Sequence, residues 1–100
     1  MTAIYLEQDG DRYTVSAQGH ATGSMEVCAA VSTLLYTLDA WLHNTDLAVL
    51  HERLEPGDAL IEYAGAEADA QAAFNFVSVG FMQLAKSEPT TINVEAKIIS

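Results

Sequence analysis

Apolar residues recur at steps of three and four along residues 25–44, and this spacing constrains the fold more than any other feature. The stripe consists of Val27, Val31, Leu34, Leu35, Leu38, Trp41 and Leu42. Such a period gives an α-helix with one apolar face, which has to be buried against another layer. Ser24 is a suitable N-cap, and Glu26 places negative charge in the first turn, where the helix dipole favours it. The sequence therefore predicts one helix over residues 25–44.

The segment before this helix has the shorter period of a β-strand. Tyr13, Val15 and Ala17 alternate with polar residues, and an Asp-Gly-Asp turn at residues 9–11 precedes them. Residues 2–18 are therefore expected to form a β-hairpin.

The second half of the chain repeats the order. Residues 46–54 fit either a strand or a helix, but the Glu-Pro-Gly-Asp turn at 55–58 and the apolar run at 59–64 favour a second hairpin. A helical period follows over residues 68–85, interrupted only mildly by a glycine, and alternation returns over 91–99.

The expected order is β-β-α-β-β-α-β, without a linker or repeat, so residues 1–100 are expected to form one domain. Two helices on one face of a mostly antiparallel sheet would bury every apolar stripe, which predicts an α+β two-layer sandwich.

Charge and composition limit the partners. The chain has 14 acidic and 4 basic residues and a net charge of -10. This charge repels nucleic acid and favours a basic protein or peptide, although it could also serve solubility alone. The start of the chain lacks the pattern of a secretion signal, and no apolar stretch approaches the roughly 20 residues that span a bilayer. One cysteine cannot form an internal disulfide, so we expect a cytoplasmic protein without membrane contact.

The segment 19–32 is where chemistry is most expected. It places His20 just after a strand and Cys28 in the first turn of the helix. The helix dipole and unpaired backbone N–H groups favour a thiolate there, and a nearby imidazole can accept its proton. The same N–H groups could hold an oxyanion, while Gly19 and Gly23 allow sharp turns around His20.

Each of these two residues, considered alone, fits a structural role better, and only their closeness beside a helix start makes the catalytic role equally consistent. A lone cysteine is usually a small buried apolar residue, and a histidine beside a turn often only caps it. Cys28 lies at the edge of the apolar stripe rather than at its centre, which weakens the structural interpretation without removing it.

Two sequence blocks resemble the signature of the Prp cysteine proteases, which process a ribosomal protein in bacteria. The blocks are Gly19-His20-Ala21 and Val27-Cys28-Ala29-Ala30-Val31-Ser32, separated by a short loop that contains a glycine. The resemblance implies Cys28 as nucleophile, His20 as general base, no cofactor and a homodimer. It also places a serine at position 32, one helical turn after the cysteine and on the same face.

The loop departs from the family pattern. Only seven residues separate His20 from Cys28, and Met25 stands where many members have an aspartate, which leaves Glu26 as the nearest carboxylate. Short loops of this kind resemble those of prophage-associated members, so the expected substrate is a short segment of a ribosomal or phage structural protein. The alternative is a non-catalytic acidic homodimer that binds a basic protein.

The remaining polar and aromatic residues have simpler interpretations. His43 is expected to cap the end of the first helix, and His51 to be a solvated residue. The three histidines are scattered, without paired spacing or a second cysteine, so no metal site is predicted. Aromatic residues on the helices are expected in the core or in a dimer interface; they are Trp41, Phe74, Phe76 and Phe81.

Overall fold

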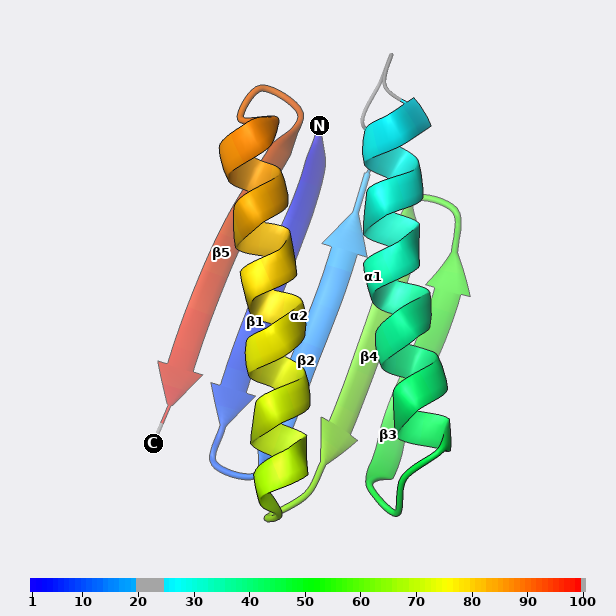
Figure 1. The fold of residues 1–100 in the computed structure, drawn as a ribbon, viewed down its shortest axis with the longest axis vertical. Helices are drawn as coiled ribbons and strands as arrows, with labels where there is room; N and C mark the ends of the chain where they lie inside the picture. Colours follow the sequence, from blue (N-terminus) through cyan, green and yellow to red (C-terminus); the bar gives the residue numbers. More distant parts are fainter. Residues whose placement is uncertain (20–24, 100) are drawn as a thin grey trace.

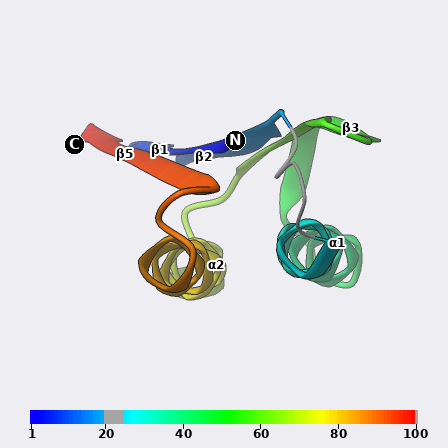
Figure 2. The ribbon, with the colours of Figure 1, turned by 90° about the horizontal axis from the view of Figure 1, so that it is seen from above.

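The computed structural model describes residues 1–19 and 25–99, which fold into two layers. The strands are β1 (Thr2–Asp9), β2 (Arg12–Gln18), β3 (Ala48–Glu55), β4 (Asp58–Ala64) and β5 (Ile92–Ile99). The helices are α1 (Met25–His43) and α2 (Ala68–Ser87), which both cover the same face of the sheet (Figures 1 and 2). The predicted order and the α+β two-layer sandwich are confirmed, and residues 46–54 resolve into a strand rather than a helix.

The sheet is mixed, with the order β3-β4-β2-β1-β5. The pairs β1–β2, β2–β4 and β3–β4 are antiparallel, and β1–β5 is parallel. The parallel pair requires a crossover, which α2 supplies on its way from β4 to β5. The two hairpins therefore meet at β2 and β4, in the middle of the sheet.

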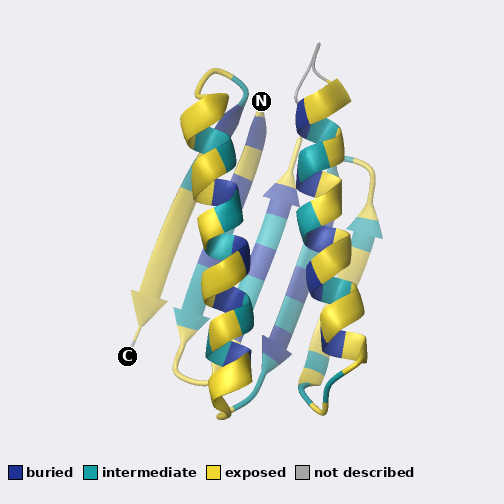
Figure 3. Cartoon of the chain, in the orientation of Figure 1, coloured by how far each residue is buried: buried dark blue, intermediate teal, exposed yellow. Residues whose placement is uncertain are grey.

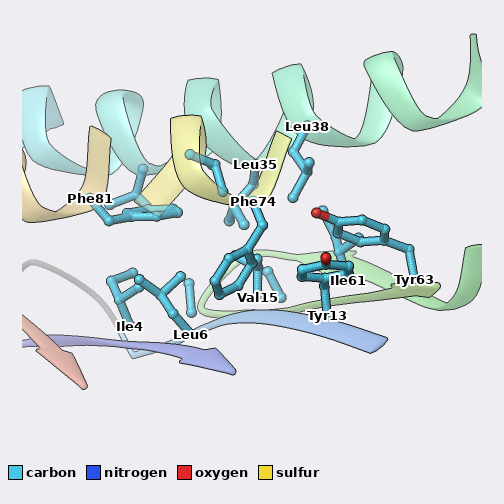
Figure 4. Packing of buried hydrophobic residues seen from close by; sticks show 14 of the residues in the cluster. Ile4, Leu6, Tyr13, Val15, Leu35, Leu38, Ile61, Tyr63, Phe74 and Phe81 are labelled. Atoms are coloured by element: carbon cyan, nitrogen blue, oxygen red, sulfur yellow. The ribbon is translucent and has the colours of Figure 1, made fainter. Parts of the chain in front are cut away.

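The core lies between the helices and the covered face of the sheet (Figures 3 and 4). Val27, Val31, Leu35, Leu38 and Leu42 form the buried side of α1, as the stripe predicted. On α2 the buried residues include Phe74 and Phe81, whereas Phe76 is 80% exposed and Trp41 of α1 is 38% exposed.

Specific contacts fix α2 on this layer. The rings of Tyr13 and Tyr63 stack with their centroids 5.0 Å apart, and the Tyr63 hydroxyl donates a hydrogen bond to the Ala70 carbonyl at 3.0 Å. Gly80 allows close approach to α1, because a Cβ there would lie 2.7 Å from Leu34 Cδ2. The glycine within the predicted helix thus has a packing role.

The length of α1 corrects one expectation from the sequence. The helix has 19 residues, and 18 consecutive residues within it have a mean hydropathy of 1.2, so it is long and apolar enough to cross a membrane by length and composition. Core helices of soluble proteins satisfy the same criterion, and one side of α1 is buried against the sheet.

Burial predicts a clear contrast between two isoleucines that lie in strands. Ile61 in β4 has no exposed surface, whereas Ile98 in β5 is 64% exposed. Ile61→Ala should lower the free energy of unfolding by about 2–5 kcal/mol, because it leaves a cavity in the core. Ile98→Ala should change it by less than about 1 kcal/mol. Denaturant unfolding of both variants measures the difference, and equal losses would contradict the assignment of the core.

Candidate active site

Three parts of the chain converge at one end of the sandwich. The first turn of α1, the end of β2 and the turn between β3 and β4 all lie at the end where β1 begins (Figure 1). A pocket of about 200 Å³ opens between them. Its described lining residues are Thr2, Ala17, Gly19, Cys28, Val31, Ser32, Leu35, Tyr36, Leu54, Glu55, Pro56, Gly57, Asp58 and Ala59.

Cys28 lies where the sequence placed it. It is the fourth residue of α1, in the first turn, and its half-buried side chain both packs against the core and lines the pocket. The first turn of a helix carries the positive end of the helix dipole. The Cys28 thiol therefore lies where the helix dipole favours a negative charge.

The other residues on this side of α1 follow the helical repeat. Ser32 is one turn after Cys28 and Tyr36 one turn further, and all three line the pocket. This confirms the predicted common face of Cys28 and Ser32. Tyr36 was not predicted as a site residue, although the same spacing of four residues could have indicated that it shares this face of the helix. Glu26 is exposed in the first turn and does not line the pocket.

The turn between β3 and β4 forms the opposite wall of the pocket. The sequence did not predict that this turn belongs to the site. Asp58 holds this turn through two neighbours: Arg53 lies 3.0 Å from its carboxylate and Gln18 Nε2 2.7 Å away. The hydrogen bond from Arg53, followed by that from Gln18, lowers the pKa of Asp58. The carboxylate is therefore charged at neutral pH, and it fixes the wall to β2 beside the pocket.

Four of the predicted site residues lie outside the described residues: His20, Ala21, Gly23 and Ser24. They belong to the segment 19–24, where a protease would have to admit its substrate, and most of that segment is likewise outside the described residues. The structure does describe Gly19, which leads into His20. Its N–H donates to the Gly57 carbonyl at 2.9 Å, and its φ is +89°. A Cβ on Gly19 would lie 2.6 Å from the Met1 carbonyl oxygen, so only glycine fits there without a shift.

The other two histidines lie away from this pocket. His43 ends α1, as predicted, and its Nε2 lies 2.8 Å from Glu52 Oε2 in β3. This hydrogen bond raises the pKa of His43 and lowers that of Glu52. His51 is a solvated residue of β3, which confirms its prediction.

Comparison with known proteins identifies the family. The model of the family described as cysteine protease Prp matches residues 1–93. The chain belongs to this family. It is therefore a cysteine peptidase, and the resemblance seen in the two sequence blocks is confirmed. No curated protein sequence matches the chain.

Solved structures share the fold. The ribosomal processing protease Prp from S. aureus, in complex with a covalently linked product peptide, has a TM-score of 0.81 and 19% identity, with 97% of this chain and 100% of that one covered. The same protease with a substrate peptide has a TM-score of 0.73 and 16% identity, with coverage of 97% and 100%. SMU.848 from Streptococcus mutans has a TM-score of 0.76 and 22% identity, with coverage of 98% and 95%.

The position of Gly19 predicts a difference between two glycines. Gly10 also has a positive φ, of 60°, but a Cβ there would meet nothing within 4 Å. Gly10→Ala should cost about 1–2 kcal/mol of unfolding free energy from backbone strain alone. Gly19→Ala should lower the free energy of unfolding by more than Gly10→Ala does. It should also reduce peptidase activity, because the added contact with Met1 displaces the strand end that leads to His20. Thermal unfolding and activity assays of both variants test this, and equal effects would contradict it.

Proposed function

We propose that the chain is an endopeptidase in which His20 activates Cys28 to cut a short, mobile segment of a basic ribosomal or phage protein in the cytoplasm. The observation that carries this proposal is the position of Cys28. It lies in the first turn of α1, on a pocket whose far rim is the strand end that leads directly to His20. Membership of a cysteine protease family favours this function over the non-catalytic interaction module.

The chemistry follows from groups of this chain alone. His20 takes the proton from Cys28 Sγ, and the thiolate attacks the peptide carbonyl carbon. Backbone N–H groups of the first turn of α1 stabilise the oxyanion. His20 then gives its proton to the leaving amine, and the acyl group stays on Cys28 as a thioester. A water molecule, deprotonated by His20, hydrolyses the thioester and frees the thiol.

The proposed substrate rests on pocket size and charge. A pocket of about 200 Å³ accepts one side chain beside the cut bond rather than a folded domain. The net charge of -10 attracts a basic segment and raises its rate of encounter. Peptides are bound by the S. aureus protease of the same fold, which supports a peptide substrate for this chain.

Two variants test the roles of His20 and Cys28. Cys28→Ala should abolish cleavage of a basic peptide substrate and leave the fold intact, because little volume is lost at this half-buried position. His20→Ala should reduce kcat/KM by about 10²–10⁴-fold, because the thiol loses its proton acceptor. The rate of alkylation by iodoacetamide at neutral pH should fall in the same variant.

His51→Ala is the matched control, since His51 is exposed on β3 and away from the pocket. It should keep wild-type cleavage and alkylation. Equal alkylation rates for wild type and His20→Ala, together with undiminished cleavage, would overturn the assignment of His20.

We also propose that two copies pair through the outer faces of α1 and α2. Two copies that each carry a net charge of -10 repel each other, and the repulsion is smallest when they meet through a surface without charges. Residues 27–38 and 70–85 contain no charged side chain, and an apolar groove of about 350 Å³ runs between the helices. Trp41 and the exposed Phe76 both line this groove, so Phe76 of one copy has an apolar site to fill on the other.

Charge at position 76 tests this dimer. Phe76→Glu should convert the dimer to monomers, because it buries an unpaired carboxylate in the contact. Ile98→Glu places the same change at another exposed residue, on β5, that does not line the groove, and should leave the dimer unchanged. Sedimentation of both variants gives the result. A monomeric wild type, or a dimer that survives Phe76→Glu, would refute the proposed interface.

A further inference from the structure

A second group of reactive side chains lies at the other end of α1, in a place that the peptidase chemistry does not use. Asp39 and His43 are one helical turn apart, and Glu52 reaches them from β3. His43 is 15 positions after Cys28, which separates the two sites by roughly 22 Å along the helix axis. The group is therefore independent of the Cys28 pocket.

The three side chains lie close enough together to share one metal ion. His43 Nε2 lies 2.8 Å from Glu52 Oε2 and 3.5 Å from Asp39 Oδ1, and one ligand atom from each residue falls within 4.8 Å of the others. Ligand atoms at 2.0–2.1 Å from a tetrahedral zinc ion lie about 3.3 Å apart. Small side-chain shifts would place all three around one ion.

The state of Asp39 gives a separate reason to expect a cation. Its Oδ1 atom is shielded from solvent and accepts no hydrogen bond from the described residues; its ion-pair partner His43 Nε2 lies 3.5 Å away. Its side chain is only 17% exposed, yet it lies next to a second carboxylate, that of Glu52. A buried acceptor without a donor is costly, and two adjacent carboxylates repel each other. A divalent cation between them would remove both costs.

A β-bulge determines which side chains meet. The pairing of β3 with β4 shifts between Val49 and His51, so that Glu52 rather than His51 lies opposite Ile61. Ile61 is on the buried face of the sheet, and Glu52 therefore points toward α1, while His51 pairs with Glu62 on the other face. The bulge in β3 thus directs the Glu52 carboxylate toward the end of α1.

We propose that Asp39, His43 and Glu52 bind a divalent transition-metal ion, with Zn²⁺ the expected occupant. An imidazole ligand favours zinc over calcium or magnesium, which prefer oxygen ligands alone. His43 is 54% exposed, which leaves room for water to complete a tetrahedral site. The bound ion would join the last turn of α1 to the edge strand β3.

Equilibrium dialysis of the full chain against Zn²⁺ at pH 7.5 tests the proposal. The measurement uses the Cys28→Ala background, so that the thiol cannot supply a competing ligand. We expect saturable binding of one ion per chain and a higher Tm with zinc. Co²⁺ should give the intense visible absorption of a tetrahedral site.

Three ligand variants and one control assign the site. Asp39→Asn, His43→Gln and Glu52→Gln should each weaken zinc binding by roughly tenfold or more and remove the rise in Tm. His51→Gln removes a neighbouring exposed histidine that is not a ligand and should bind zinc as the parent does. Circular dichroism checks that each variant is folded. Two of the substitutions lie in α1 and the third in β3, so a variant that fails to fold leaves the others informative.

Two results would overturn the proposal. One is the absence of saturable binding at one ion per chain, which would mean that a shared proton, rather than a metal, separates the carboxylates. The other is zinc affinity that survives in folded His43→Gln and Glu52→Gln variants, which would place the ion elsewhere.

Discussion

Burial of one side of α1 against the sheet is the interaction on which the rest of this structure depends. Apolar residues at helical spacing pack α1 over β3 and β4, and removing them from water supplies most of the stabilisation in a domain of this size. The same contact fixes the position of α1 on the sheet and its rotation about its own axis. Because Cys28 is at the edge of the buried stripe, the packing also directs its side chain to the pocket.

The packing of α1 on the sheet also determines which residues lie next to each of its two polar ends. At its start, Cys28 faces the turn between β3 and β4, which Asp58 ties to Arg53 and Gln18. At its end, His43 and Asp39 face Glu52. A helix anchored along its length by a rigid apolar face can hold distinct groups at both ends, because neither end has to hold the helix in place. A peptidase site and a metal site are thus compatible on one element.

The outer face of the two helices contrasts with the rest of the surface. The chain is strongly acidic, but its charges lie on strands, turns and helix ends, and the exposed helix face carries Phe76, Val79 and Met82 instead. Exposed apolar residues in a group commonly mark a surface that a partner covers. The charge distribution therefore separates a surface suited to another copy from surfaces that attract a basic substrate.

The sequence alone determined the order of elements, the two-layer fold and the position of Cys28 in the first turn of α1. These follow from periodicity, turns and caps, which are local properties of the chain, and the two motif blocks gave the family. Tertiary structure alone decided which residues surround Cys28 and His43. The Glu55–Asp58 turn joins the pocket, and the bulge in β3 exchanges His51 for Glu52 beside α1. Such meetings depend on strand order and register, which arise from packing between segments distant in the sequence and leave no local pattern to read.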